Sequence, residues 1–141
     1  MRTSLLALLV AISLTVPLLA IAGDDIPDLK GTWTGKSSSI KYGKGDPKAH
    51  IAEKDLGKIS SMDFTLIIDF QEGRVFSGTH ASAKNKERIV GVIRSDNKRI
   101  CITDEDSFFF AELLAPDKLE IVWMEVQFPV HGVAHAVYTK K

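Results

Sequence analysis

The chain has 141 residues, with 18 basic and 18 acidic side chains and a hydrophobic fraction of 45 %. This length suits one domain and is short for two, and the apolar content is ample for the core of a small barrel or sandwich. Because the formal charge is zero and the basic residues are scattered along the chain, the sequence argues against a nucleic-acid partner.

Residues 1–22 have the pattern of a secretory signal peptide. Arg2 precedes an apolar stretch, and Ala20-Ile21-Ala22 supplies the small residues of a cleavage site. We therefore expect a signal peptide over 1–22, a single β-barrel domain over 23–141, and a periplasmic or secreted protein. An uncleaved membrane anchor is the alternative, since the stretch nearly spans a bilayer. The acidic residues after Ala22 favour cleavage, and no stable membrane insertion is expected after it.

The first part of the expected domain contains one strand and one undetermined segment. Thr, Trp and Ile among polar residues predict a strand over Gly31–Ser37, with a possible continuation to Tyr42. The segment Gly43–Lys58 contains several Gly residues and one Pro around a charged stretch. A weak helical turn, a mobile loop and an irregular strand all fit that composition.

The clearest pattern is a hairpin made of Phe64–Phe70 and Arg74–His80. The linker between the two β-rich runs is short, polar and ends in Gly73, which is typical of a turn between antiparallel strands. Apolar residues recur with a period of two, as in a strand with one buried face. The residues expected to build the inner wall here are Phe64, Leu66, Ile68, Phe70 and Phe76.

Short β-rich runs separated by polar turns continue to the C terminus, with a predicted loop at Pro129–Gly132. These runs are Arg88–Arg94, Arg99–Asp104, Phe108–Leu114, Leu119–Val126 and Val133–Thr139. Turn signals at such regular intervals indicate an all-β meander of about eight strands. We predict an up-and-down antiparallel β-barrel whose last strand closes against the first, with a β-sandwich as the alternative. A barrel of this size either fills its interior with side chains or holds one small ligand.

Cys101 is the only cysteine, so no intramolecular disulfide can form. It lies in a predicted strand, where we expect a buried, unreactive thiol. The alternative is a reactive thiol or an intermolecular disulfide.

The polar residues predict neither a catalytic site nor a metal or other cofactor. His131 and His135 would lie about 13 Å apart along a strand, too far to share one ion. The run Asp104-Glu105-Asp106 fits a solvated turn whose Asp side chains cap backbone N–H groups. A calcium or other cation site is the alternative there, but the run lacks the ligand spacing and the glycine of a calcium loop. No nucleophile motif of the G-x-S-x-G type is present.

Two short motifs carry a family resemblance. Gly31-Thr32-Trp33 on the first strand and Phe76-Ser77-Gly78-Thr79 on a later one resemble the avidin/streptavidin-like barrels and, more loosely, the calycin group that includes lipocalins. The resemblance implies a ligand at the barrel mouth and a polar binding residue near Lys36 or Ser37. Where that family has a ligand-binding tyrosine, this chain has His80, which does not support biotin as the ligand. A later pocket tryptophan of that family would correspond to Trp123.

His80 is the first candidate for a polar group in a pocket, because it shares the expected inner face with Phe76 and Gly78. Trp33 and Trp123 fit a core role better than ligand stacking. The candidate ligand-binding residues are Ser37, Phe76, His80 and Trp123. The sequence thus predicts non-catalytic binding of a small apolar or amphipathic molecule and leaves the oligomeric state open. The alternative is a protein-interaction module, such as an exported inhibitor or envelope accessory protein, that uses the segment 43–58.

Overall fold

The computed structural model describes residues 25–43, 56–125 and 131–141, and within these ranges the only regular elements are β-strands. Eight strands follow one another along the chain: β1 (Gly31–Tyr42), β2 (Ser60–Glu72), β3 (Val75–Ala81), β4 (Lys86–Ile93), β5 (Arg99–Thr103), β6 (Ser107–Ala115), β7 (Lys118–Glu125) and β8 (His131–Lys140). The predicted signal peptide, His50 and most of the segment 43–58 lie outside the described residues. No helix able to cross a membrane occurs among the residues that the structure describes.

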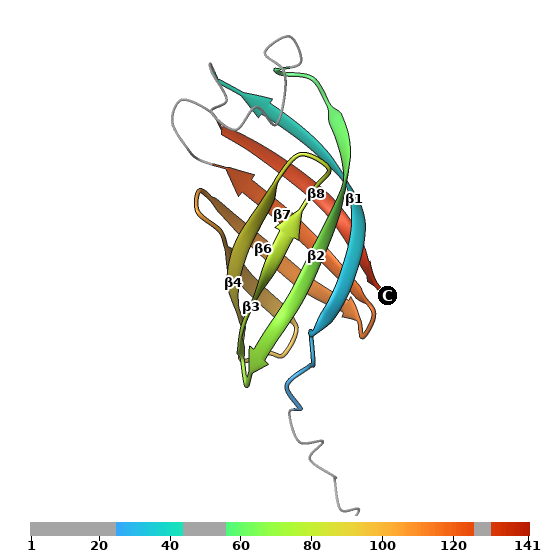
Figure 1. Cartoon of the computed structure of the whole chain (residues 1–141), viewed down its shortest axis with the longest axis vertical. Helices are drawn as coiled ribbons and strands as arrows, with labels where there is room; N and C mark the ends of the chain where they lie inside the picture. The colour runs from blue at the N-terminus through green and yellow to red at the C-terminus, as the bar shows by residue number, and fades with distance from the viewer. Residues whose placement is uncertain (1–24, 44–55, 126–130) are drawn as a thin grey trace, which may run out of the picture.

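The strands form one closed barrel in which each strand pairs with its neighbours in the sequence (Figure 1). All pairings are antiparallel, and β8 returns to pair with β1, so that Trp33 lies opposite Lys140. Figure 1 shows the C terminus beside β1 as a result. The predicted up-and-down antiparallel barrel is confirmed, and the sandwich alternative is wrong because a single sheet closes on itself.

One half of the barrel interior is packed with apolar side chains. Alternation along each strand points every second residue inward, and the inward residues of neighbouring strands meet in layers. Trp33 and Leu119 are fully buried there. The other buried apolar residues of this core are Leu29, Leu66, Ile68, Phe76, Ile89, Ile93, Ile100, Ile102, Phe109, Ala111, Ile121, Ala136 and Tyr138.

The segment that precedes β1 closes this end of the barrel. Leu29 is 1 % exposed, and its carbonyl oxygen accepts a hydrogen bond of 2.8 Å from Trp33 Nε1. Gln71 fixes the same segment from β2, since its Oε1 accepts a bond from Leu29 N at 2.8 Å and its Nε2 donates to Pro27 O at 2.9 Å. Hydrogen bonds with Trp33 and Gln71 therefore hold the buried Leu29 over the apolar end of the barrel.

Three expectations from the sequence are corrected by the structure. Phe70 does not belong to the inner wall: a β-bulge shifts the register between Ile68 and Phe70, and Phe70 is 52 % exposed. His131 lies in β8 opposite Tyr42 rather than in a loop. Cys101 is half-buried instead of buried, because it alternates with the buried Ile100 and Ile102 and so points out of the barrel.

Candidate ligand-binding site

The other half of the barrel interior carries polar side chains among apolar ones, and we call it the polar half. Starting from buried Trp33, the period of two brings Ser37, Ser39 and Lys41 to the inner face of β1. Met62 and Ser60 lie opposite Ser37 and Ser39 on β2. The serines bond locally: Ser37 Oγ donates to Met62 O at 3.3 Å, and the Oγ atoms of Ser39 and Ser60 are 2.9 Å apart.

A partly enclosed cavity lies in this polar half. The volume open to the centres of water molecules is about 70 Å³, enough for several waters or a small organic group. Its walls combine aromatic and hydroxyl groups, among them Ser37, Ser39, Ser60, Phe64, Phe109, Trp123 and Tyr138. Ser82, Lys84, Asn85 and Glu87, in and after the β3–β4 connection, complete the lining at the barrel end. The cavity therefore offers both stacking surfaces and hydrogen-bonding groups.

His80 is held in this cavity by rings on two sides. Its imidazole stacks on Phe64 with 4.7 Å between centroids and 7° between planes, and it meets Phe109 edge to face at 5.1 Å. His80 Nε2 is 2.9 Å from the Tyr138 hydroxyl oxygen, and either atom can donate, depending on the tautomer. The ring is thus fixed in position with one hydrogen bond made inside the protein.

Burial keeps His80 neutral near physiological pH. Removal from water lowers the pKa of His80 from 6.5 to about 4, and the negative charge of Glu87, its cross-strand neighbour, opposes this shift only in part. Burial also raises the pKa of Tyr138, so that its hydroxyl stays protonated. His80 and Tyr138 therefore present neutral donors and acceptors to the cavity.

A buried ion pair forms another part of the polar interior. Lys41 and Glu125 are 3 % and 1 % exposed, and Lys41 Nζ donates to Glu125 Oε2. The ammonium also lies 4.7 Å from the centre of the Trp123 ring, within range of a cation–π interaction. Glu125 Oε1 is buried and has no hydrogen-bond partner among the described residues. The pair places one charge of each sign inside the barrel.

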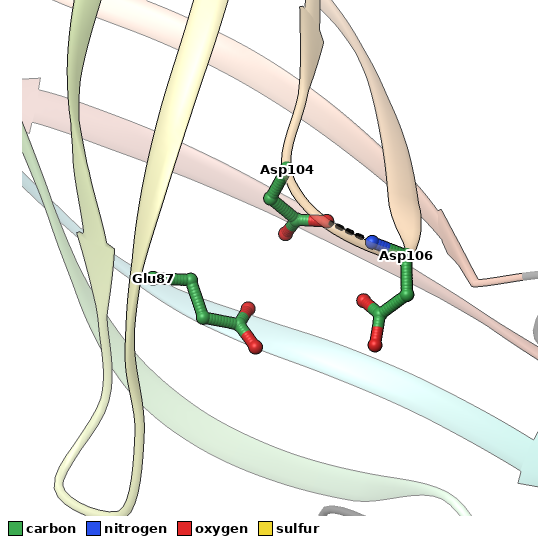
Figure 2. Close-up of side chains that lie close together, drawn as sticks. All are labelled: Glu87, Asp104 and Asp106. Carbon is green, nitrogen blue, oxygen red and sulfur yellow. Dashed lines mark hydrogen bonds between the residues drawn. The ribbon is translucent and has the colours of Figure 1, made fainter.

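Three carboxylates converge at the same barrel end, from β4 and the β5–β6 turn (Figure 2). Glu87, Asp104 and Asp106 each offer an oxygen within 4.8 Å of the other two, which makes them the described residues best placed to hold one cation. Asp104 Oδ1 caps the turn by accepting bonds from Asp106 N at 3.1 Å and Ser107 N at 2.7 Å, as the sequence predicts. Burial raises the pKa of Asp104 to about 6, and the charges of Glu87 and Asp106 act in the same direction.

Three of the four candidate residues meet in the cavity. Ser37, His80 and Trp123 line it, whereas Phe76 does not. Phe76 is 3 % exposed and packs in the apolar half, with its ring against Gly91 of β4. Lys36, the other position implied by the avidin-like resemblance, is exposed on the outside of β1.

The residues of this site that were not predicted from the sequence are Lys41, Glu125 and Tyr138. A signal for Lys41 was present: it is eight positions after Trp33, an even spacing that puts both on one face of a continuous strand. The strand was predicted over Gly31–Ser37 with only a possible continuation to Tyr42, and the structure confirms the longer version. Glu125 and Tyr138 carry the same kind of signal, since each lies two positions after an inward residue of its predicted strand, Trp123 and Ala136 respectively.

Comparisons with known proteins do not identify a family for this chain. No protein-family model matches the sequence, and no curated protein matches it. Among solved structures, the crystal structure of zebrafish ileal bile acid-binding protein complexed with cholic acid is similar at 14 % identity and a TM-score of 0.39, over 79 % of this chain and 98 % of that chain. A likeness at this level identifies no family, so the site is interpreted from its own residues.

Proposed function

We propose that this protein is an exported, non-catalytic binding protein that holds a small amphipathic molecule in the polar half of its barrel. The observation that supports this function most directly is the cavity around His80, with aromatic rings and hydroxyl groups on its walls. Barrels of this size have room for at most one small ligand. Export is supported by the signal-peptide pattern over residues 1–22.

The size of the cavity limits the ligand. Pockets for drug-sized molecules measure roughly 300–1,000 Å³. The cavity here, at about 70 Å³, fits a molecule of a few non-hydrogen atoms or the head of a longer one that extends past Ser82 and Lys84. The ligand expected from the lining has a flat apolar part beside Phe64 and Phe109. It also has an uncharged polar group within reach of Ser37 or His80.

The test is native mass spectrometry of the protein purified from its own host. We expect an added mass that disappears on denaturation and falls at least about tenfold in occupancy in Ser37→Val, which removes a polar group from the wall. The matched control is Ser38→Val, because Ser38 is the next residue of β1 and is exposed on the outside. A protein that carries no added mass, or equal retention in both variants, would contradict the proposed site.

A further inference from the structure

The outer surface of the barrel carries one unusually apolar region. It consists of Val75, Val90, Val92, Cys101, Phe108 and Phe110 on strands β3 to β6, and we call it the outer apolar face. Four of its members are direct neighbours across the sheet, since Val75 pairs with Val92, Val92 with Cys101, and Cys101 with Phe110, while Val90 and Phe108 both pair with Thr103. Except for half-buried Cys101, each is between 41 % and 57 % exposed.

The outer apolar face is hollowed beside the half-exposed ring of Phe110. An open depression of about 660 Å³ lies over β3, β4 and β5, measured as the volume open to the centres of water molecules. Phe70 of β2 and Phe108 of β6 stand at its two sides, and the valines and Cys101 lie between them. Phe110, 52 % exposed, lies next to Cys101 but does not line the depression.

We propose that the outer apolar face is a homodimer interface, in which Phe110 of each copy fills the depression of the other. In a two-fold dimer the same surface faces itself, so a knob and a hollow side by side on one face become complementary. Strand addition is not available as a mode of association, because every strand of the closed barrel already has two partners. Contact between side-chain faces is the remaining mode.

The charges around this face favour a second copy over an anionic partner. The described residues that line the depression include no charged side chain. Near the face, Arg88 pairs with Asp69 at 2.7 Å and Lys98 with Glu112 at 2.6 Å, while Glu72, opposite Val75, is exposed. The depression therefore offers an apolar ring of a second copy an uncharged surface, and it offers a nucleic acid or an anionic membrane no basic side chain.

The area fits a weak dimer. Phe108 and Phe110 of the face and Phe70 beside it are about half exposed, which corresponds to roughly 300 Å² in total for rings of about 200 Å² each. With the three valines, the face and the Phe70 ring beside it reach roughly 500 Å², within the range of the largest apolar patches of monomers. Two copies would bury about 1,000 Å², close to the lower limit for specific interfaces. We therefore expect dissociation in the micromolar range.

Sedimentation velocity over a micromolar concentration series tests the proposal. The wild type should shift from monomer to dimer mass across the series, and Val92→Arg should raise the dissociation constant at least about tenfold by placing a charge in the interface. The control is Val137→Arg, since Val137 is 42 % exposed on β8, close to the 41 % of Val92, and lies outside the outer apolar face. This control should dimerise as the wild type does.

Circular dichroism checks that each variant is folded, and Val90→Lys replaces Val92→Arg if the latter is not. A wild type that stays monomeric throughout the series overturns the proposal. Dimerisation unchanged in the folded Val92→Arg or Val90→Lys variant overturns it as well, as does loss of the dimer in Val137→Arg. A monomer that co-sediments with phosphatidylcholine vesicles would instead assign the face to lipid.

Discussion

His80 combines an aromatic environment with a single hydrogen bond inside the protein. Its ring lies between Phe64 and Phe109, and Tyr138 bonds its Nε2. Such a neutral imidazole can orient a ligand, but charging it in place would require a proton in surroundings that disfavour the charge. The same arrangement therefore links the candidate site to the stability of the whole barrel.

Acid should destabilise the protein through His80. The pKa is about 4 in the folded protein and 6.5 when the group is unperturbed, so the unfolded chain binds the proton more tightly between these values. The contribution of His80 is complete above pH 6.5 and is lost as the pH falls toward 4, up to roughly 3 kcal/mol. Urea unfolding at several pH values should show this slope in the wild type and a smaller one in His80→Gln.

His135→Gln is the matched control for that experiment. The His135 side chain is 56 % exposed and pairs with Glu120 on the outside of the barrel. The decrease in slope should be larger in His80→Gln than in His135→Gln. Equal slopes in His80→Gln and the wild type would show that His80 is not kept neutral by burial.

Asp104 should change the stability of the protein with pH in the opposite direction from His80. Its pKa is raised from 3.8 to about 6, so its contribution to stability is present below pH 3.8 and is lost as the pH rises through 6. Asn can accept the same two backbone N–H bonds without the charge. We expect Asp104→Asn to be more stable than the wild type above pH 6, by about 1 kcal/mol after allowance for solvent screening, and equal to it near pH 3. Thermal unfolding at the two pH values measures this.

Asp96 provides a control in which the charge stabilises the fold. Backbone N–H groups of Arg99 and Lys98 and the Arg99 guanidinium hold the pKa of Asp96 well below its usual range. Asp96→Asn should therefore lower the melting temperature at neutral pH. A stabilising effect of Asp96→Asn, or a destabilising one of Asp104→Asn at pH 8, would be inconsistent with these environments.

Removing one partner of the Lys41–Glu125 ion pair should destabilise the protein strongly, whereas replacing both by apolar residues should destabilise it much less. Lys41→Met leaves the Glu125 carboxylate buried without its partner, and we expect a loss of about 3–5 kcal/mol in the free energy of unfolding. The double variant Lys41→Met/Glu125→Leu removes both charges and should lose much less than the sum of the two single variants. Additive losses in urea unfolding would mean that the two side chains do not interact.

At the scale of the strands, β2 shows why a period of two is a local rule. Leu66 and Ile68 are buried as the pattern predicts, but the bulge before Phe70 inserts one residue and turns the next side chain outward. The sequence around Asp69 contains no glycine or proline that would indicate such a bulge. The direction of the Phe70 side chain therefore depends on how β2 pairs with β3, and the sequence alone does not show this pairing.

Phenylalanines on the paired strands β2 and β3 should differ sharply in stability. Phe76→Ala removes a ring that is 3 % exposed and should cost about 3–5 kcal/mol. Phe70→Ala removes one that is 52 % exposed and should cost less than about 1 kcal/mol, measured at concentrations where the protein is monomeric. Similar losses for both variants would place both rings on the same side of the sheet.

For the molecule as a whole, the barrel was predictable because its signals are local. Regular hairpins between short alternating strands leave few topologies, and closure of the last strand on the first follows from the meander. The candidate site was predictable only where inward direction could be inferred, as for Ser37, His80 and Trp123. Phe76 was placed on the correct face, but its depth along the barrel axis depends on strand stagger, which residue order does not show.

The pairing of Trp33 with Lys140 also has a kinetic consequence. Hairpins from β1–β2 to β7–β8 join segments close in sequence, whereas the β1–β8 seam requires the two ends of the described chain to meet. Closing so long a loop costs chain entropy that local pairing does not, and topologies with such contacts fold in milliseconds to seconds. The barrel cannot close before the whole of β8, His131–Lys140, is available. A ribosome or a membrane pore that still holds this C-terminal strand would therefore keep the barrel open, with one edge of β1 exposed.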